Sequence, residues 1–348
     1  MKRLTLDVLN NLPPIQGQGS NAPPPPASLR TKISPSGNPQ AIKDGSIQFI
    51  GNATTLLEWK GVRLMTDPNF LHAGDHVHLG PGVTATRLKN PAIDLQELPR
   101  IDAVLLSHYH EDHFDRQVED SLRRDLPIIT TPHAYQHLAE AKPANEAFTQ
   151  VHALQFFESM LIEAAGERKG PIKAPKPGIK VTGIPGKHVP PGPANVFGAA
   201  NDLFGLVPPT NGWMLELGYY TSSEPASEEE DFTCGYRIYI SGDTLMVDEL
   251  KQIPERYKGQ KIDLMLVHLA ANLPLLMVTM DANQGLQLVQ LINPEMTIPI
   301  HFDDYDVFKS TLDDFKQVVA KAGLDNKVVH LDRGDRYQFS VLSVQAGS

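Results

Sequence analysis

The chain has 348 residues and 41% of them are hydrophobic, so it can bury an ample core in one large domain or two small ones. Its 41 acidic and 31 basic residues give a formal net charge of −10, which disfavours nucleic acid or an anionic membrane surface as a partner. The single cysteine excludes an internal disulfide, and the chain has neither a signal-peptide pattern nor a run of about 18 apolar residues. We therefore expect a cytoplasmic protein with no transmembrane segment.

Residues 1–44 differ in composition from the rest of the chain. Four consecutive prolines at 23–26 follow a segment containing Gly, Ser and Asn, and further Pro, Ser and Gly residues come after them. Such a composition favours extended or disordered chain. We interpret residues 1–44 as a flexible arm and residues 45–348 as one domain. The arm could also act as a recognition segment, or as a strap across a partner subunit in a homo-oligomer.

From residue 45 onward, strand patterns alternate with helix patterns. Short β-type runs bounded by Gly, Pro or Asp occur at 46–51, 54–59, 62–67, 103–108 and 127–131. Helices are predicted at 115–124, at 133–142 and from an N-cap at Asp281 to Ile292.

A further helix is predicted near the C-terminus, where apolar residues fall at helical spacing ahead of Gly323 as a C-cap. Its core-facing stripe comprises Phe308, Leu312, Phe315 and Val319. Two longer irregular stretches, 69–99 and 189–212, are expected to form pocket walls. The second contains apolar residues that suit a nonpolar substrate.

The segment with the clearest chemistry is 107–113, which directly follows the apolar run 103–106. Four potential metal ligands fall within six residues there: His108, His110, Asp112 and His113. Alternate side chains of an extended segment point the same way, and a following turn can swing the last two round to face the first two. A mixed His/Asp set suits Zn, Mn or Fe better than Ca or Mg. The segment therefore predicts a metal site with ligands for two neighbouring ions.

Three later positions share one format, in which a β-rich run and a Gly or Pro precede a His or Asp. His188 follows the run 179–187, Asp243 follows 236–242, and His301 follows 296–300. One short segment cannot surround an ion, so ligands from elsewhere in the chain are needed. These three residues are the candidates.

On these residues the chain resembles the metallo-β-lactamase-fold hydrolases. The resemblance rests on the HxHxDH motif at 108–113, on His188, on Gly242-Asp243-Thr244 and on His301, and it covers roughly residues 46–305. Residues 50–58 and the triplet Thr66-Asp67-Pro68 look like the branch that contains L-ascorbate-6-phosphate lactonase and N-acyl-phosphatidylethanolamine phospholipase D.

The resemblance implies an α/β fold, a four-layer αββα sandwich whose site lies at one edge, where strand-end turns converge. It also implies two divalent ions, with zinc favoured and Mn or Fe as alternatives. By the resemblance, the ligands of one ion would be His108, His110 and His188. Those of the second would be Asp112, His113 and His301, with Asp243 bridging both.

Four other residues are candidates for contact with substrate or for proton transfer. Asn52 stands where relatives of that branch usually carry His, and it can donate a hydrogen bond but cannot titrate. Tyr109 and Tyr305 each lie close in sequence to a proposed ligand. His268 ends the apolar run 263–267, where a strand end would reach the site, and is a candidate for a substrate or proton-transfer role.

The expected reaction is hydrolysis of a small molecule by water activated between two ions, because metal binding can lower the pKa of water to about 7. Asp112 or a metal-bound water would carry the proton to the leaving group. Basic residues near the proposed site are sparse, the nearest candidates being Arg63, Arg87, Arg116 and Lys187. We therefore favour a lactone or lactam over a phosphodiester or phospholipid headgroup. A di-iron redox centre or a non-catalytic binding protein are further alternatives.

Overall fold

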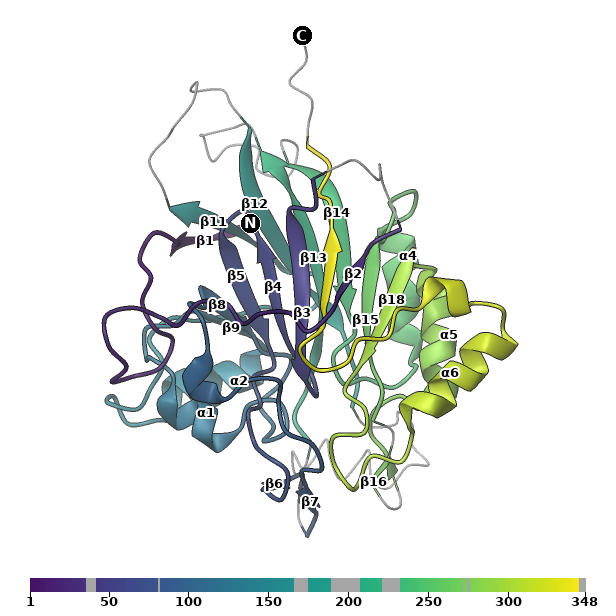
Figure 1. Ribbon diagram of the computed structural model, residues 1–348, viewed down its shortest axis with the longest axis horizontal. Helices are drawn as coiled ribbons and strands as arrows, with labels where there is room; N and C mark the ends of the chain where they lie inside the picture. The colour runs from purple at the N-terminus through teal and green to yellow at the C-terminus, as the bar shows by residue number, and fades with distance from the viewer. Residues whose placement is uncertain are drawn as a thin grey trace.

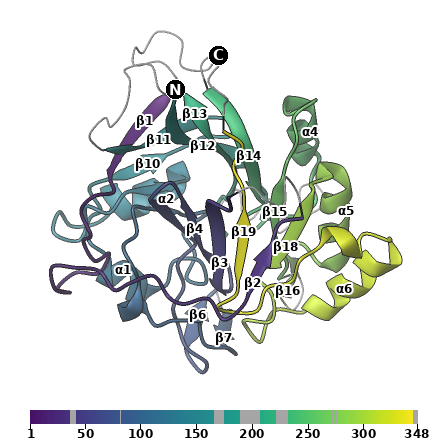
Figure 2. The same cartoon turned by 45° about the horizontal axis from the view of Figure 1, so that its top comes forward.

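A computed structural model describes residues 1–35, 42–80, 82–165, 175–188, 207–220, 232–270, 272–273 and 276–343. In this part of the chain two mixed β-sheets pack face to face, and helices cover their outer sides (Figures 1 and 2). Helices α1 and α2 lie beside one sheet, and α4, α5 and α6 lie beside the other. This is the expected four-layer arrangement.

The first sheet has seven strands among the described residues. In spatial order they are β1 (Lys2–Asp7), β11 (Ser159–Ala165), β12 (Lys176–Pro185), β13 (Asn211–Tyr220), β14 (Phe232–Ile240), β15 (Leu264–His268) and β18 (Met296–Ile300). Strands β12, β13 and β14 pair antiparallel, whereas β14, β15 and β18 pair parallel. The carboxyl ends of β12, β14, β15 and β18 therefore meet at one edge.

The second sheet has eight strands in the described part of the chain. Their order is β10 (Val151–Ala153), β9 (Ile128–Thr130), β8 (Ala103–Leu105), β5 (Val62–Thr66), β4 (Thr54–Trp59), β3 (Gly45–Gly51), β19 (Arg336–Phe339) and β2 (Thr31–Ile33). Two small hairpins stand apart from the sheets: β6 (His76–His78) with β7 (Thr84–Thr86), and β16 (Asn272–Leu273) with β17 (Leu276–Met277).

The helices of the described residues are short. They are α1 (Arg116–Ser121), α2 (Pro132–Tyr135), which continues as the π-helical turn η2 (Gln136–Glu140), α4 (Gln252–Arg256), α5 (Ala282–Ile292) and α6 (Leu312–Lys321). The 3-10 turns are η1 (Leu95–Glu97), η4 (Asp248–Lys251) and η5 (Asp325–Lys327). None of the helices in the described ranges is long and apolar enough to cross a membrane.

The core follows the period of two in the strands. Ile47 and Phe49 of β3 face the space between the two sheets, where Trp59 packs edge-on against Tyr219. Ile50 and its same-face neighbours in the second sheet instead pack under α1 and α2. Strands buried on both faces explain why the sequence reads as continuous apolar runs there.

The N-terminal segment differs from the flexible arm that its composition predicts. Leu4 and Leu6 are buried, and their strand β1 pairs in parallel with β11, whereas β2 pairs with β19 on the other sheet. Between them Ile15 forms a β-bridge to Leu122. Backbone hydrogen bonding at two free sheet edges, together with alternating apolar side chains, orders this segment despite its prolines.

The C-terminal helix begins later than its apolar spacing predicts. Thr311 is the N-cap and accepts a hydrogen bond from the Asp314 amide, so the helix starts at Leu312. Phe308 therefore lies in the preceding turn, not in the helical stripe. Gly323 has a φ of 68° just beyond the helix, which is the left-handed conformation expected after a C-cap.

Candidate metal centre

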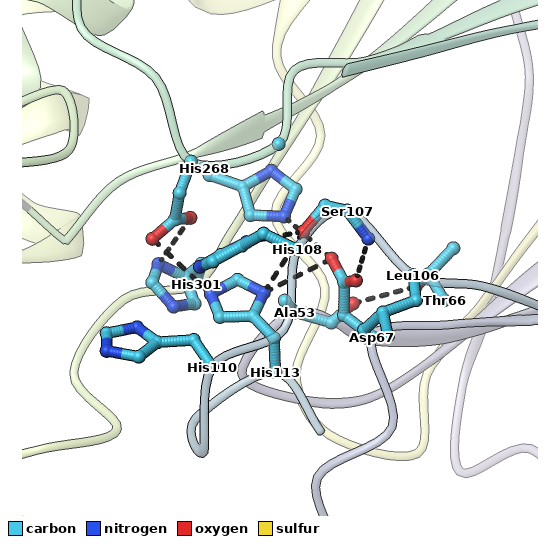
Figure 3. Close-up of polar contacts among 12 residues, drawn as sticks. Ala53, Thr66, Asp67, Leu106, Ser107, His108, His110, His113, His268 and His301 are labelled. Atoms are coloured by element: carbon cyan, nitrogen blue, oxygen red, sulfur yellow. Dashed lines mark hydrogen bonds and ion pairs between the residues drawn. The ribbon is translucent and has the colours of Figure 1, made fainter. Parts of the chain in front are cut away.

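All seven predicted ligands lie at the carboxyl ends of strands. His108, His110, Asp112 and His113 lie on the turn after β8, and His188, Asp243 and His301 follow β12, β14 and β18. Because these strand ends meet at one edge of the sandwich, residues almost 200 positions apart become neighbours. Figure 3 shows His108, His110 and His113, from the turn after β8, close to His301, from the end of β18.

The seven side chains form two groups. In the first group, a ligand atom of each of His108, His110 and His188 lies within 4.8 Å of the other two. In the second group the same limit holds among Asp112, His113, Asp243 and His301. Within the described chain both groups are buried, apart from the half-buried His110.

Asp243 lies between the two groups. Its Oδ2 atom is 3.3 Å from Nε2 of His113 and 3.8 Å from Nε2 of His188, and its Oδ1 atom is 3.4 Å from Nδ1 of His301. Thr279 Oγ1 donates a hydrogen bond of 2.9 Å to Oδ2. The carboxylate is therefore placed to serve both groups.

The outward-facing ring nitrogens have partners that orient the imidazoles. Ser107 Oγ lies 2.9 Å from Nδ1 of His108, Asp67 Oδ2 lies 3.2 Å from Nδ1 of His113, and the Val278 carbonyl pairs with Nδ1 of His188. The Nε2 atoms of these three histidines are buried and have no hydrogen-bond partner among the described residues. Orphaned nitrogens that face carboxylates fit a metal cation, because buried polar atoms otherwise lose hydrogen-bonding energy.

The protonation of His108, His188 and Asp243 also suits a cation, whereas at His113 the carboxylates of Asp243 and Asp112 outweigh burial and raise the pKa well above its usual value. Burial lowers the pKa of His188 to about 4 and, with the nearby His113 imidazole, holds the pKa of His108 well below its usual value. Burial alone would raise the pKa of Asp243, but His301 and His113 hold it well below its usual range. Neutral imidazole and ionised carboxylate are the forms that bind metal.

The cluster opens into a small cavity of about 30 Å³, enough for one or two water-sized groups. His110, Asp112, His188, Asp243 and His301 line its polar side. Its other described lining residues are Leu79, Val207, Ala270, Val278, Thr279, Val307 and Phe308. These include no Lys or Arg. The prediction that 69–99 supplies a pocket wall holds for Leu79, whereas 189–206 lies outside the described residues.

The candidate substrate residues do not line this cavity. Tyr109 donates its hydroxyl to Glu119 at 2.8 Å and stacks on His137, away from the ligands. Tyr305 is buried, and its hydroxyl accepts a hydrogen bond of 2.9 Å from Asn69 Nδ2. Asn52 is also fully buried and donates through Nδ2 to the carbonyl of Asp112 at 2.6 Å. All three make contacts within the protein, and their contact with substrate stays a prediction.

His268 lies behind the cluster and outside the described cavity lining. Its ring stacks on that of His113 at 6.1 Å, its Nδ1 is 3.1 Å from Ser241 Oγ, and its Nε2 is 3.8 Å from Oδ2 of Asp67 (Figure 3). This placement supports orientation of His113 rather than proton transfer to a substrate.

Asp67 is the residue that the site assignment from sequence missed. It follows β5, has a φ of 34°, accepts the Ser107 amide at 2.7 Å and contacts His113. The signal was present, because Asp67 has the same strand-end position as the assigned ligands. From the sequence, the triplet Thr66-Asp67-Pro68 served only as evidence of the family resemblance, and Asp67 was not assigned to the site.

Comparison with known proteins identifies the family of this chain. The family model described as beta-lactamase superfamily domain matches residues 62–302, so the chain belongs to the beta-lactamase superfamily. The chain is 21% identical over 262 residues to a UPF0173 metal-dependent hydrolase of Thermodesulfovibrio yellowstonii, covering 74% of this chain and 82% of the relative. It is 26% identical over 246 residues to one of Polynucleobacter asymbioticus, covering 71% of this chain and 73% of the relative.

Two solved structures are similar in fold. An isothiocyanate hydrolase from Delia radicum gut bacteria gives a TM-score of 0.63 at 18% identity and covers 85% of this chain and 100% of its own. A possible metal-dependent hydrolase from Veillonella parvula gives a TM-score of 0.61 at 18% identity and covers 85% of this chain and 99% of its own. The expected fold is confirmed. Fold, family and ligand cluster define a metal-dependent hydrolase of the beta-lactamase superfamily; the narrower lactonase and phospholipase D branch stays a prediction.

Proposed function

We propose that the protein hydrolyses a cyclic ester or amide of a small, uncharged molecule at a centre that holds two divalent ions, with zinc first and Mn or Fe as alternatives. The observation that carries this proposal is the pair of ligand groups beside a cavity whose described lining bears no cationic side chain. When bound, two such ions supply an activated water nucleophile and polarise the electrophilic oxygen.

The roles of the chain's own residues follow from their positions. His108, His110 and His188 would hold one ion, Asp112, His113 and His301 the second, and Asp243 would bridge them. Asp112 lines the cavity, so its carboxylate is also placed to take a proton from water and pass it to the leaving group. The apolar side chains at the mouth would exclude bulk water and receive the nonpolar part of the substrate.

The state of the nearby cations favours a lactone or lactam over a phosphodiester. Hydrolysis of a phosphodiester is favoured by nearby Arg or Lys groups that meet its charge. The four candidates are instead paired with carboxylates: Arg63 with Glu58, Arg87 with Asp304, Arg116 with Glu111 and Lys187 with Glu249. Phosphodiester or phospholipid headgroup cleavage is therefore the second candidate. A cytoplasmic location and a homo-oligomeric state stay predictions from the sequence.

The test combines elemental mass spectrometry of untagged protein with a hydrolysis panel before and after chelation. The panel contains lactones, lactams, a phosphodiester and an aryl isothiocyanate, the last because of the similar fold of the Delia radicum gut hydrolase. We expect about two ions per chain and chelator-sensitive ring opening. Selective diester cleavage would favour the second candidate, and a chain that binds no Zn or Mn would refute both.

A further inference from the structure

Arg87 lies fully buried close to the candidate metal centre, in the stretch between β7 and η1, although it contacts no proposed ligand directly. Its Nη1 atom donates to Asn69 Oδ1 at 2.8 Å, its Nη2 atom is 3.1 Å from Asp304 Oδ1, and its Nε atom donates to the Lys89 carbonyl at 2.9 Å. The guanidinium also lies 5.1 Å from the Tyr305 ring centre. Burying a cation is costly unless it is paired, and Asp304 supplies the opposite charge, although Nη2 makes no hydrogen bond among the described residues.

One branch of this network reaches the metal turn through Asp304 and Asn52. Asp304 is itself buried, and its Oδ2 atom accepts the Asn52 amide at 3.2 Å. The Asn52 side chain donates to the Asp112 carbonyl at 2.6 Å, and the Asn52 carbonyl accepts the His301 amide at 2.8 Å. Asn52 thus joins two proposed ligands of the second group.

The other branch runs through Asn69. Its Oδ1 atom accepts from Arg87, which leaves Nδ2 to donate to the Glu111 carbonyl at 3.1 Å and to the Tyr305 hydroxyl at 2.9 Å. The amides of Asn52 and Asn69 therefore hold two successive carbonyls, those of Asp112 and Glu111, directly before His113.

The network makes its contacts with the second ligand group: it holds the Asp112 carbonyl and the His301 amide, whereas Ser107 and the Val278 carbonyl are the partners of His108 and His188. His110 of the first group is linked to it through Asp112, whose Oδ1 atom lies 3.1 Å from His110 Nδ1. His301 and Asn52 both have left-handed φ values, 58° and 52°, which cost energy in residues other than glycine and persist only where neighbours hold them. Asp304 is such a neighbour of Asn52, and it is itself held by ion pairs with Arg87 and Arg333.

The geometry points to Arg87 as a positioning residue for the second ion: through Asn69 and through Asp304 with Asn52 it fixes the turn that carries Asp112 and His113 and the backbone of His301. This inference rests on the proposed two-ion centre. It predicts that the two ions respond differently to a change at Arg87.

The test is titration of the metal-free full chain with Co²⁺, followed by calorimetry and by visible absorption, which reports each ion's coordination. For Arg87→Met we expect one ion at wild-type affinity and the second weakened about 10-fold, the lower end of the cost of losing a direct partner of a metal ligand, because Arg87 acts through Asn69 and Asp304. Arg87→Lys keeps the charge but not the planar guanidinium, so its affinity for the second ion should lie between those of the wild type and of Arg87→Met.

A second variant covers the case in which Arg87→Met does not fold. Asn52→Gly removes only the side-chain amide, because glycine adopts the left-handed backbone of residue 52 without strain. It should also weaken the second ion and spare the first.

The matched control is Arg63→Met. Arg63 is a buried, ion-paired arginine of β5, with Glu58 at 2.8 Å, at the end of that strand opposite Asp67. The Arg63→Met variant should bind both ions with wild-type affinity. Suppose that the wild type binds two ions. If Arg87→Met and Asn52→Gly then bind both ions with unchanged affinity, or lose affinity for both equally, the positioning role is overturned and the two-ion centre is not. A wild-type chain that binds fewer than two Co²⁺ ions would overturn the two-ion centre and the positioning role with it.

Discussion

Oδ2 of Asp243 lies 3.3 Å from Nε2 of His113, although the two residues are 130 positions apart in sequence. The same oxygen is 3.8 Å from Nε2 of His188, which belongs to the other ligand group. One carboxylate at the end of β14 thus joins ligands that come from both sheets of the sandwich. This joining makes Asp243 the most informative position for mutation.

Replacement of Asp243 by Asn should lower turnover by roughly 100-fold or more, because the bridge between the two groups loses its charge. His108→Ala should have a similar effect through the first group. Circular dichroism should show a retained fold in both variants, and elemental analysis should show less bound metal. His152→Ala, a change at a half-buried histidine on the edge strand β10, is the control. Wild-type activity in both site variants would contradict the assignment of the centre.

The apolar mouth of the cavity should set the size of the accepted substrate. Leu79 lies in the wall that the β6–β7 hairpin supplies, so Leu79→Ala should enlarge the cavity. The ratio of kcat/KM for a substrate with a longer acyl chain to kcat/KM for one with a short chain should then rise by about 10-fold. Phe308→Leu should shift the preference in the same direction. Leu88 belongs to the same stretch but is 52% exposed, so Leu88→Ala should leave the ratio unchanged. Equal behaviour of the Leu79 and Leu88 variants would exclude the hairpin from the substrate pocket.

The N-terminal strand should contribute measurably to stability. Leu6 is 3% exposed in β1, so Leu6→Ala should lower the free energy of unfolding by about 2–4 kcal/mol in urea titrations. Leu9, three residues further on, is 75% exposed, and Leu9→Ala should change the free energy of unfolding by less than about 0.5 kcal/mol. Equal stabilities of the two variants would show that β1 does not pair with β11 in solution.

The only cysteine should react slowly with thiol reagents. Burial raises the pKa of the Cys234 thiol to about 12, so at pH 8 only about one molecule in 10⁴ carries the reactive thiolate. The rate of reaction with a disulfide reagent should keep rising with pH beyond 9, whereas the urea-unfolded chain should level off near its ordinary value of about 8.5. A fast native reaction that levels off near pH 8.5 would show that the thiol is not shielded.

The fold was largely readable because local patterns and burial agree in this chain. The runs predicted at 46–51 and 54–59 are β3 and β4 to within one residue, and Asp281 caps α5 as expected. The boundary of α6 was misread because the Phe308 side chain has helical spacing with Leu312 but the Thr311 and Asp314 capping box starts the helix after it. The order of residues 1–35 was missed because composition does not reveal a free sheet edge.

By itself, the sequence determined which side chains are available to hold metal, because a His or Asp placed directly after a strand reaches the edge of a sheet whatever the rest of the fold does. Only the tertiary structure decided how the other polar residues are used. Asn52 was a candidate for substrate contact from the family resemblance, Tyr305 from its nearness to a ligand in sequence, and His268 from its place at a strand end. In space they face a backbone carbonyl, an amide and an imidazole, and contact with substrate stays a prediction. Long-range packing sets which way a buried polar group points, since it must find a partner wherever the fold supplies one.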